Sequence, residues 1–203
     1  LPFEPRPRHR LQRLPAGGVH QVERHAQDLR DADGAVGGLP FDLRRAGMNL
    51  GEGAAALLLV RPDLAPHTSG LFLAGYGASA DAYHMTTPDP EGRGARLAMQ
   101  GALDRAGVTA DAVGYVNLHG TGTPYNDLSE SRAVHELFGP DTPCSSTKGY
   151  IGHLLGAAAG VEAAITLAAL RRQRLPRNLN FEQPDPAVPI RIAALARLIR
   201  RIG

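Results

Sequence analysis

The pattern of hydrophobic and polar positions changes at Leu39. Residues 1–39 show neither strand-like alternation nor sustained helical periodicity, and they are rich in proline, arginine, histidine and glycine. We expect this segment to be poorly structured. From residue 40 to residue 189, short apolar runs alternate with longer stretches of helical character, which predicts one folded domain. Residues 190–203 form a divergent basic tail.

Four short apolar runs predict β-strands. Ala54 to Val60 is a continuous apolar run that follows the turn at Gly51-Glu52-Gly53, so it suits a strand buried on both faces. The other three runs are Leu71 to Ala78, Ala112 to Leu118, and a short stretch near Cys144 to Thr147.

Two amphipathic stretches predict helices between these strands. The first leads from Pro88 to Gly94 into a helix through Ala106, with Gly107 as its left-handed C-terminal residue. The second opens at Asp127 and Glu130, which have the spacing of a capping box, and closes at Gly139. Its Leu128, Ser131, Val134, Leu137 and Phe138 leave one apolar side.

A third stretch, Ile151 to Leu170, is almost wholly apolar and dense in small residues. A helix of about 20 residues is long enough to span a membrane. His153 and Glu162 lie inside this stretch, however, and strands alternate with helices before it. We therefore predict a helix buried between protein layers, no membrane span, and an α/β fold whose sheets are covered by helices on both faces.

Composition narrows the functional classes. With 203 residues, 43% hydrophobic and 21% charged, the chain can bury a core, and a single cysteine excludes a disulfide scaffold or a multi-thiolate zinc site. No secretory segment is evident, so we expect a cytoplasmic protein without a metal. The net charge of +2 is concentrated at the two ends, and aromatic residues make up only 5%, so no nucleic-acid partner is expected.

Three basic side chains are candidates for chemistry. Lys148 is the only lysine among 22 lysine and arginine residues, which favours a compact and mobile donor at that position. His119 ends a predicted strand and enters a Gly-rich turn, where α/β sheets expose their sites. His153 lies five residues after Lys148, near the start of the apolar stretch, where a core role is the plain alternative.

Three segments together resemble the β-ketoacyl-acyl-carrier-protein synthases of the thiolase-like superfamily. They are Pro40-Phe41-Asp42 through Gly51-Glu52-Gly53-Ala54, Asn117 through Pro124 with Asn126-Asp127, and Ser145 through Gly149 with Gly152 through Ala158. The similarity covers Pro40 to Pro186 and corresponds to the second half of a synthase. It implies a thiolase-like layered α-β-α-β-α architecture, of which this chain holds the C-terminal half.

The resemblance implies roles for seven residues. His119, His153 and Lys148 match the catalytic histidines and lysine of that family, with the two imidazoles donating to an enolate oxygen. Glu162 and Asp127 match its supporting carboxylates. Lys148 is the favoured partner of Glu162, whereas Asp127 is either a supporting carboxylate or only a helix cap. Thr121 and Thr123 match a pair that binds phosphopantetheine, or they satisfy local backbone groups.

The implied reaction is a decarboxylative condensation of malonyl-carrier protein with an acyl thioester, in fatty-acid or polyketide and polyene synthesis. No cofactor is implied, since the phosphopantetheine arm belongs to acyl carrier protein, and the intact family is dimeric. The family's cysteine nucleophile falls upstream of Leu1, and Cys144 suits a core position, so we expect a fragment that is inactive in condensation when alone. Decarboxylation by the fragment stays open, since both histidines and the lysine are present.

Two alternatives remain open. One is a non-catalytic, chain-length-factor-like subunit of a heterodimeric synthase; retention of both histidines and the lysine disfavours it. The other concerns the two ends of the chain. Residues 1–39 and 190–203 have the composition expected from out-of-frame translation of a GC-rich gene. The tail has, alternatively, the pattern of a basic amphipathic helix.

Overall fold

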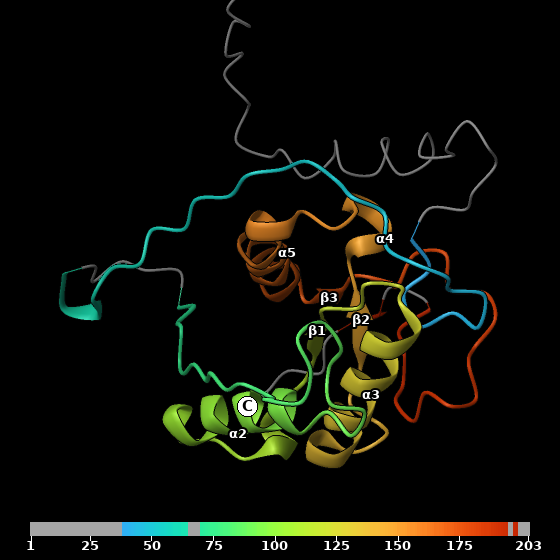
Figure 1. Ribbon diagram of the computed structural model, residues 1–203. Helices are drawn as coiled ribbons and strands as arrows, with labels where there is room; N and C mark the ends of the chain where they lie inside the picture. Colours follow the sequence, from blue (N-terminus) through green and yellow to red (C-terminus); the bar gives the residue numbers. More distant parts are fainter. Residues whose placement is uncertain (1–37, 65–69, 195–196, 199–203) are drawn as a thin grey trace, which may run out of the picture.

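The computed structural model describes residues 38–64, 70–194 and 197–198 (Figure 1). The expectations for residues 1–37, and those for the tail at 195–196 and 199–203, lie outside the described residues. The described elements mix helices with short strands, as the alternating pattern predicts. They are η1 (Pro62–Leu64), α2 (Arg93–Ala106), η2 (Ala110–Ala112), β1 (Val116–Leu118), α3 (Pro124–Phe138), β2 (Cys144–Ser146), α4 (Lys148–Ile151), η3 (Leu155–Ala157), α5 (Ala158–Arg172), β3 (Arg174–Leu175) and β4 (Arg197–Leu198).

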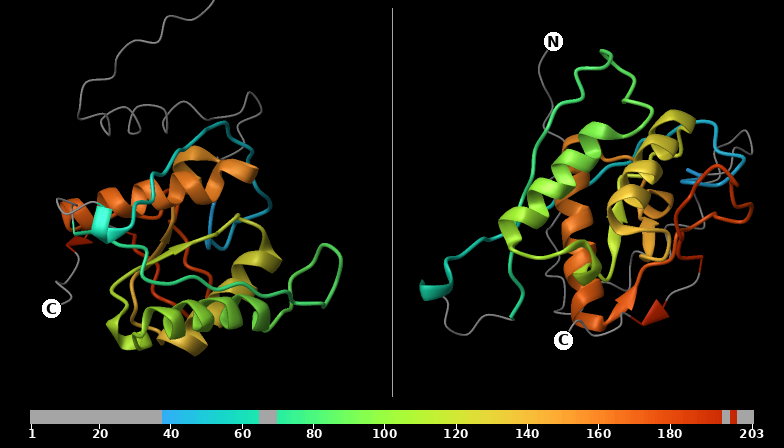
Figure 2. Two further views of the ribbon diagram at one scale, coloured as in Figure 1. Left: turned by 90° about the vertical axis from the view of Figure 1, so that its left-hand side faces the viewer. Right: turned by 90° about the horizontal axis from the view of Figure 1, so that it is seen from below.

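Strands β1 and β2 form a parallel pair in the centre. Val116 pairs with Cys144 and Leu118 with Ser146, so both strands end at the same edge. Parallel strands need a crossover connection, which α3 supplies here. Helix α5 lies on one side of this pair, and helices α2 and α3 pack against one another on the other side (Figure 2).

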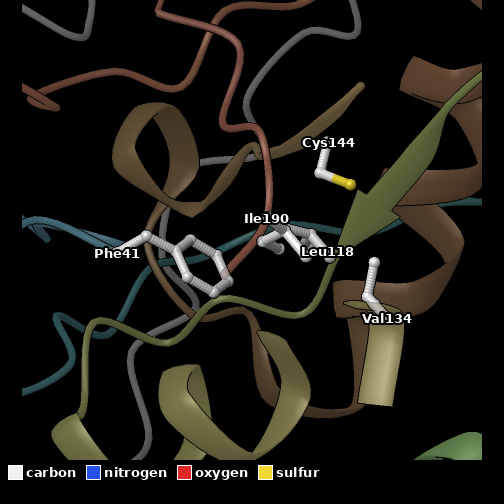
Figure 3. Packing of buried hydrophobic residues seen from close by; sticks show 5 residues of the cluster. All are labelled: Phe41, Leu118, Val134, Cys144 and Ile190. Atoms are coloured by element: carbon white, nitrogen blue, oxygen red, sulfur yellow. The ribbon is translucent and has the colours of Figure 1, made fainter. Parts of the chain in front are cut away.

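A small apolar cluster joins segments that are far apart in sequence. Phe41, Leu118, Val134 and Cys144 are fully buried, and Ile190 closes the cluster (Figure 3). Phe41 comes from the N-terminal part of the described chain and Ile190 from its end. The cluster therefore fixes the two ends of the domain against β1, β2 and α3.

Two predicted strands are wrong. No strand forms at Ala54 to Val60 or at Leu71 to Ala78, and their large side chains are exposed; Leu58 is 89% exposed and Phe72 66%. Both segments are extended, but no other described segment pairs with them along their backbone edges. A run suited to burial on both faces stays largely exposed because no described strand pairs with it, although α5 approaches it at Ala55, 3.1 Å from where a Cβ atom on Gly160 would lie.

The predicted helix at Ile151 to Leu170 is divided. Helix α4 ends at Ile151, Gly152 has a left-handed φ of 69°, and α5 begins only at Ala158. Within α5 only Ala158 and Ala169 are buried, so the helix covers one face of the strand pair and is not enclosed between layers. No helix in the described part of the chain is long and apolar enough to cross a membrane.

Other predictions hold at one end of an element and fail at the other. Helix α2 ends at Gly107 in the left-handed conformation, and α3 ends before Gly139, both as expected. Helix α3 begins at Pro124 with Thr123 as its N-cap, so Asp127 and Glu130 do not form a capping box. The predicted strand from Ala112 is shorter, because Ala110–Ala112 forms a 3-10 turn before β1.

The start of the tail is part of the sheet layer. The backbone N–H of Cys144 donates to the Arg191 carbonyl (3.1 Å), and the Ala193 N–H donates to the Cys144 carbonyl (2.8 Å). Arg197–Leu198 then pairs with β3 in an antiparallel arrangement. The described part of the tail is thus extended, and the alternative of an amphipathic helix is wrong for residues 190–194.

Candidate active site

The common edge of β1 and β2 carries the predicted catalytic residues. His119 follows the last residue of β1, and Lys148 begins α4 two residues after β2 ends. Because the strands are parallel, these two chain positions meet at one edge of the sheet. Gly120, with φ of +43°, lets the chain turn away there, and a Cβ atom on it would lie 2.4 Å from the Ser146 Cβ.

Lys148 is the centre of the polar contacts. Its side chain is 3% exposed, and Nζ lies 2.5 Å from Glu162 Oε1. The same ammonium donates to the His119 carbonyl (2.5 Å) and lies 3.2 Å from His119 Nδ1. Glu162 comes from the second turn of α5, so the predicted Lys148–Glu162 pair joins two helices across the site.

His153 is brought to His119 by a backbone bridge and not by a helix. It lies between α4 and η3, and its N–H donates to the Asn49 carbonyl at 2.7 Å. The rings of His119 and His153 meet edge to face, with centroids 5.1 Å apart and an interplanar angle of 87°. The expectation that His153 sits at a helix N-terminus, with Glu162 further along the same helix, is wrong, because Gly152 ends α4 before it.

Hydrogen bonds fix the same tautomer in both imidazoles. The Lys148 ammonium faces Nδ1 of His119, and the Leu155 N–H donates to Nδ1 of His153 at 3.0 Å. A ring nitrogen that accepts is unprotonated, so the proton of each neutral imidazole lies on Nε2. Each neutral ring therefore carries one Nε2–H donor.

The surroundings also favour the neutral form of both imidazoles. Desolvation lowers the pKa of His119 to about 4, with help from the Lys148 ammonium and from His153. Desolvation and Lys148 likewise lower the pKa of His153, while Glu162 acts in the opposite direction. Neutral donors at near-neutral pH suit the stabilisation of a developing negative charge.

Glu130 is the residue whose role the sequence analysis missed. Its two carboxylate oxygens accept the backbone N–H groups of His119 (2.7 Å) and Gly120 (2.9 Å). Desolvation raises the pKa of Glu130 to about 7, against the effect of these two hydrogen bonds. The capping box predicted from its three-residue spacing to Asp127 would have its carboxylate accept a backbone N–H at the start of a helix. The carboxylate does accept backbone N–H groups, but they are those of His119 and Gly120 in the turn after β1.

Asp127 supports the turn that follows His119. It is fully buried and accepts the N–H groups of Phe41 (2.8 Å) and Gly122 (3.2 Å). Arg45 Nε lies 3.9 Å from its Oδ2. Desolvation raises the pKa of Asp127, and these hydrogen bonds and Arg45 oppose that rise. Asp127 is therefore neither the N-cap of α3 nor a direct neighbour of Lys148.

The two threonines of the turn bond to each other. Thr121 Oγ1 and Thr123 Oγ1 are 2.8 Å apart, and the Thr123 N–H approaches Thr121 Oγ1 at 3.4 Å. Thr121 is buried and Thr123 partly buried. The hydroxyls thus satisfy local groups, and their predicted binding of phosphopantetheine stays a prediction.

Cys144 is remote from this chemistry. It is fully buried in the apolar cluster, and its thiol donates to the Thr142 carbonyl (3.1 Å). Desolvation raises the pKa of Cys144 to about 12, so the thiol stays protonated. Among the described residues no group of histidine, cysteine or carboxylate side chains could hold a metal ion.

Known proteins resemble this chain in sequence and in fold. The sequence matches the profile described as β-ketoacyl synthase, C-terminal domain, over residues 72–182. The 3-oxoacyl-[acyl-carrier-protein] synthase 2 of Synechocystis sp. is 39% identical over 167 residues, covering 79% of this chain and 40% of that protein. The same-named protein of Coxiella burnetii is 41% identical over 178 residues, covering 85% of this chain and 42% of that protein.

Solved structures show the same fold. A β-ketoacyl synthase from Burkholderia phymatum superimposes with a TM-score of 0.75 at 35% identity, covering 93% of this chain and 47% of that chain. A type II polyketide ketosynthase, solved with its acyl-carrier protein and bound to the hexaketide, has a TM-score of 0.75 at 28% identity, covering 81% and 42%. This likeness confirms the predicted thiolase-like α/β fold.

This chain spans about two fifths of the length of the curated proteins above. The family profile matches more than half of the residues of this chain, including β1, β2 and the polar cluster at their ends. The chain belongs to the β-ketoacyl synthase family, through its C-terminal domain.

Proposed function

We propose that this chain provides the malonyl-decarboxylating half of a β-ketoacyl-acyl-carrier-protein synthase, an acyltransferase. The substrate is a malonyl thioester on the phosphopantetheine arm of acyl carrier protein. The observation that carries the proposal is the convergence of His119, His153 and Lys148 at one edge of the strand pair.

The two imidazoles suit the oxyanion that forms in this step. Loss of CO2 breaks the bond between the carboxylate carbon and the α-carbon, and the electron pair passes into an enolate. The negative charge develops on the thioester oxygen, which accepts hydrogen bonds from the Nε2–H groups of His119 and His153. Both donors are preorganised and neutral, so they stabilise the enolate more than the uncharged thioester.

Lys148 favours the neutral, Nε2-protonated form of His119. Its ammonium occupies His119 Nδ1 and lowers the pKa of that ring, and Glu162 compensates the buried positive charge. The ammonium is held by the Glu162 carboxylate and the His119 carbonyl. We assign it a supporting role in decarboxylation.

Condensation needs a thiolate that carries the acyl chain, and Cys144 does not supply it. Its thiol is buried and protonated, and it lies in the apolar cluster. The enolate formed by this chain would attack an acyl thioester held on another cysteine. Without that acceptor the enolate takes a proton and the product is acetyl-carrier protein.

The alternative is a non-catalytic subunit of the chain-length-factor kind. Two similar structures, at TM-scores of 0.73 and 0.63, are titled as ketosynthases with their chain length factors. A subunit without a catalytic duty has no need of a paired buried ammonium and two oriented imidazoles, so the intact cluster favours the catalytic proposal.

Pathway, partner and location stay part of the proposal. We propose acyl carrier protein as the partner, dimeric assembly in the complete enzyme, and fatty-acid or polyketide synthesis as the setting. A cytoplasmic location is proposed as well, although relatives in Arabidopsis thaliana are named chloroplastic and mitochondrial.

The test is release of labelled CO2 from carboxyl-labelled malonyl-carrier protein, with acetyl-carrier protein identified by mass spectrometry. The wild-type chain should release CO2, and His119→Ala or His153→Ala should lower the rate by about 10²-fold. His135→Ala, an exposed histidine on α3, is the matched control and should leave the rate unchanged. Absence of release, or equal rates in all variants, would contradict the proposal.

A further inference from the structure

Ser146 lies between the two chain segments that carry the candidate catalytic groups. It is the last residue of β2 and is fully buried. Its hydroxyl donates to the Gly120 carbonyl (3.0 Å) and accepts the backbone N–H of Lys148 (3.2 Å). One hydroxyl therefore bonds to the residue after His119 and to Lys148 itself.

The Ser146 hydroxyl is a second connection between two segments that the Lys148 and His119 side chains already join. Lys148 Nζ reaches His119 through the His119 carbonyl and Nδ1. Ser146 Oγ holds the backbones of the same two segments, through the Gly120 carbonyl and the Lys148 N–H, and it lies 3.4 Å from the His119 carbonyl. The distance between the ammonium and the imidazole thus depends on two independent attachments.

Ser146 itself has little freedom. Its backbone N–H donates to Asn178 Oδ1 at 2.8 Å, and Asn178 Nδ2 donates to the Pro40 carbonyl at 2.9 Å. A Cβ atom on Gly120 would lie 2.7 Å from Ser146 Oγ, so the turn after His119 packs directly on this hydroxyl. The position of the hydroxyl is set by the surrounding fold.

We propose that Ser146 is a positioning residue that fixes the separation between the Lys148 ammonium and the His119 imidazole. The inference deepens the proposed function, since it rests on the assignment of His119 and Lys148 to the reaction. Ser146 touches neither substrate nor a reacting atom; it acts through the backbone of the two segments. Removing its hydroxyl leaves the buried Gly120 carbonyl without this donor and frees the start of α4.

Its neighbour provides a matched control. Ser145 is equally buried and lies in the same strand, but its hydroxyl bonds to the Tyr115 hydroxyl (2.7 Å) and to the Pro176 carbonyl (2.9 Å). Neither partner belongs to the segments that carry His119 and Lys148. Ser145→Ala removes a buried hydroxyl of the same kind without touching the segments of His119 or Lys148.

The measurement is the pKa of His119, followed by NMR in the full chain. The signal is assigned by its loss in His119→Gln. The charged and titratable groups that face His119 are Lys148 and His153 at the ring, Glu130 at its backbone N–H, and Glu162 behind Lys148. In Ser146→Ala the Lys148 ammonium moves away, and the His119 pKa should rise by about 1. In Ser145→Ala it should not change.

A double variant separates the positioning of Lys148 from a general loss of stability. In a Lys148→Met background the ammonium is absent, so Ser146→Ala should leave the His119 pKa where Lys148→Met alone puts it. An equal rise in both backgrounds would mean that the hydroxyl only stabilises the fold, and it would overturn the proposal. No rise in the wild-type background would overturn it as well.

The outcome is independent of catalysis. If the chain releases no CO2 but the His119 pKa responds as described, the proposed function fails and the positioning role stands. If Ser146→Ala does not fold, Ser146→Cys keeps the size of the side chain with a weaker donor, and it should raise the pKa in the same direction by less. An unchanged His119 pKa in that variant would reject the role of Ser146.

Discussion

The Nζ atom of Lys148 lies 2.5 Å from Oε1 of Glu162, although the two residues belong to different helices. Both side chains are withdrawn from solvent, with 3% and 15% of their surface exposed. A buried ammonium is costly unless a carboxylate and further acceptors surround it, and Lys148 has both. The pair therefore makes it possible to keep a positive charge beside a neutral His119.

Removal of this carboxylate should be strongly destabilising. Glu162→Gln leaves the buried ammonium without its charge partner, and we expect a loss of about 3 kcal/mol in the free energy of unfolding. Urea denaturation followed by circular dichroism measures it. Glu136→Gln is the control: Glu136 is 61% exposed and pairs with Arg96, so its loss should stay below about 1 kcal/mol. Equal effects would show that burial of the Lys148 pair is unimportant.

Gly120 should tolerate no side chain. Gly120→Ala places a Cβ atom 2.4 Å from the Ser146 Cβ and 2.7 Å from the Phe41 ring, in addition to a left-handed φ of +43°. We expect a loss of about 2–4 kcal/mol from crowding and backbone strain together. Gly107→Ala separates the two causes, because its φ is +68° but no atom lies within 4 Å. That variant should lose only about 1 kcal/mol; a similar loss at both positions would exclude crowding as the cause.

The pH dependence of stability should reveal Glu130. Its pKa of about 7 in the folded chain lies above the ordinary value of 4.5, so between these pH values the folded state binds a proton that the unfolded state does not. This contribution to stability is complete below pH 4.5 and is lost as the pH rises through 7. Glu130→Gln should remove this contribution, so the urea midpoint of the wild type minus that of Glu130→Gln should fall between pH 4.5 and 7.5. The lowered pKa of His119, about 4, acts in the opposite direction, but it is common to both proteins and cancels in this difference. A difference that stays constant with pH would contradict the assignment to Glu130.

Cys144 should be unreactive in the folded chain. Its burial and its pKa of about 12 predict slow modification by Ellman's reagent under native conditions and one reacting thiol after unfolding in urea. Incubation with a carrier protein that is loaded with an acyl chain should give no acyl-enzyme. Covalent acylation of Cys144 would overturn the conclusion that the acceptor thiol lies elsewhere.

The exposed apolar run at residues 54–60 should govern self-association. Leu58 is 89% exposed, so Leu58→Ser should change the free energy of unfolding by less than about 0.5 kcal/mol. Contiguous exposed apolar side chains favour association, so the same change should lower the self-association of the chain. Analytical ultracentrifugation measures it. Leu118→Ser, at a fully buried position, is the contrasting variant and should severely destabilise the fold. Unaltered association in Leu58→Ser would exclude this run as the contact.

Local sequence signals predicted the elements that depend on neighbouring residues. Gly107 ends α2 because a left-handed residue closes a helix wherever it occurs, and the short apolar run at Cys144 forms β2 as expected. The run at Ala54 to Val60 failed for the opposite reason: a strand requires partners from elsewhere, and none of the described segments provides them. The same holds for His153, whose position depends on a backbone bridge to Leu50.

By itself the sequence determined the family, the α/β class and the group of two histidines and one lysine, because each of these is carried by short motifs of characteristic residue types. The tertiary structure alone decided that Lys148 faces Nδ1 of His119, that Glu130 and Asp127 hold the turn instead of capping a helix, and that Cys144 is withdrawn in the core. Those relations join positions that the chain brings together only by folding. Hydrogen-bond direction and desolvation, which set protonation, depend on distances in space.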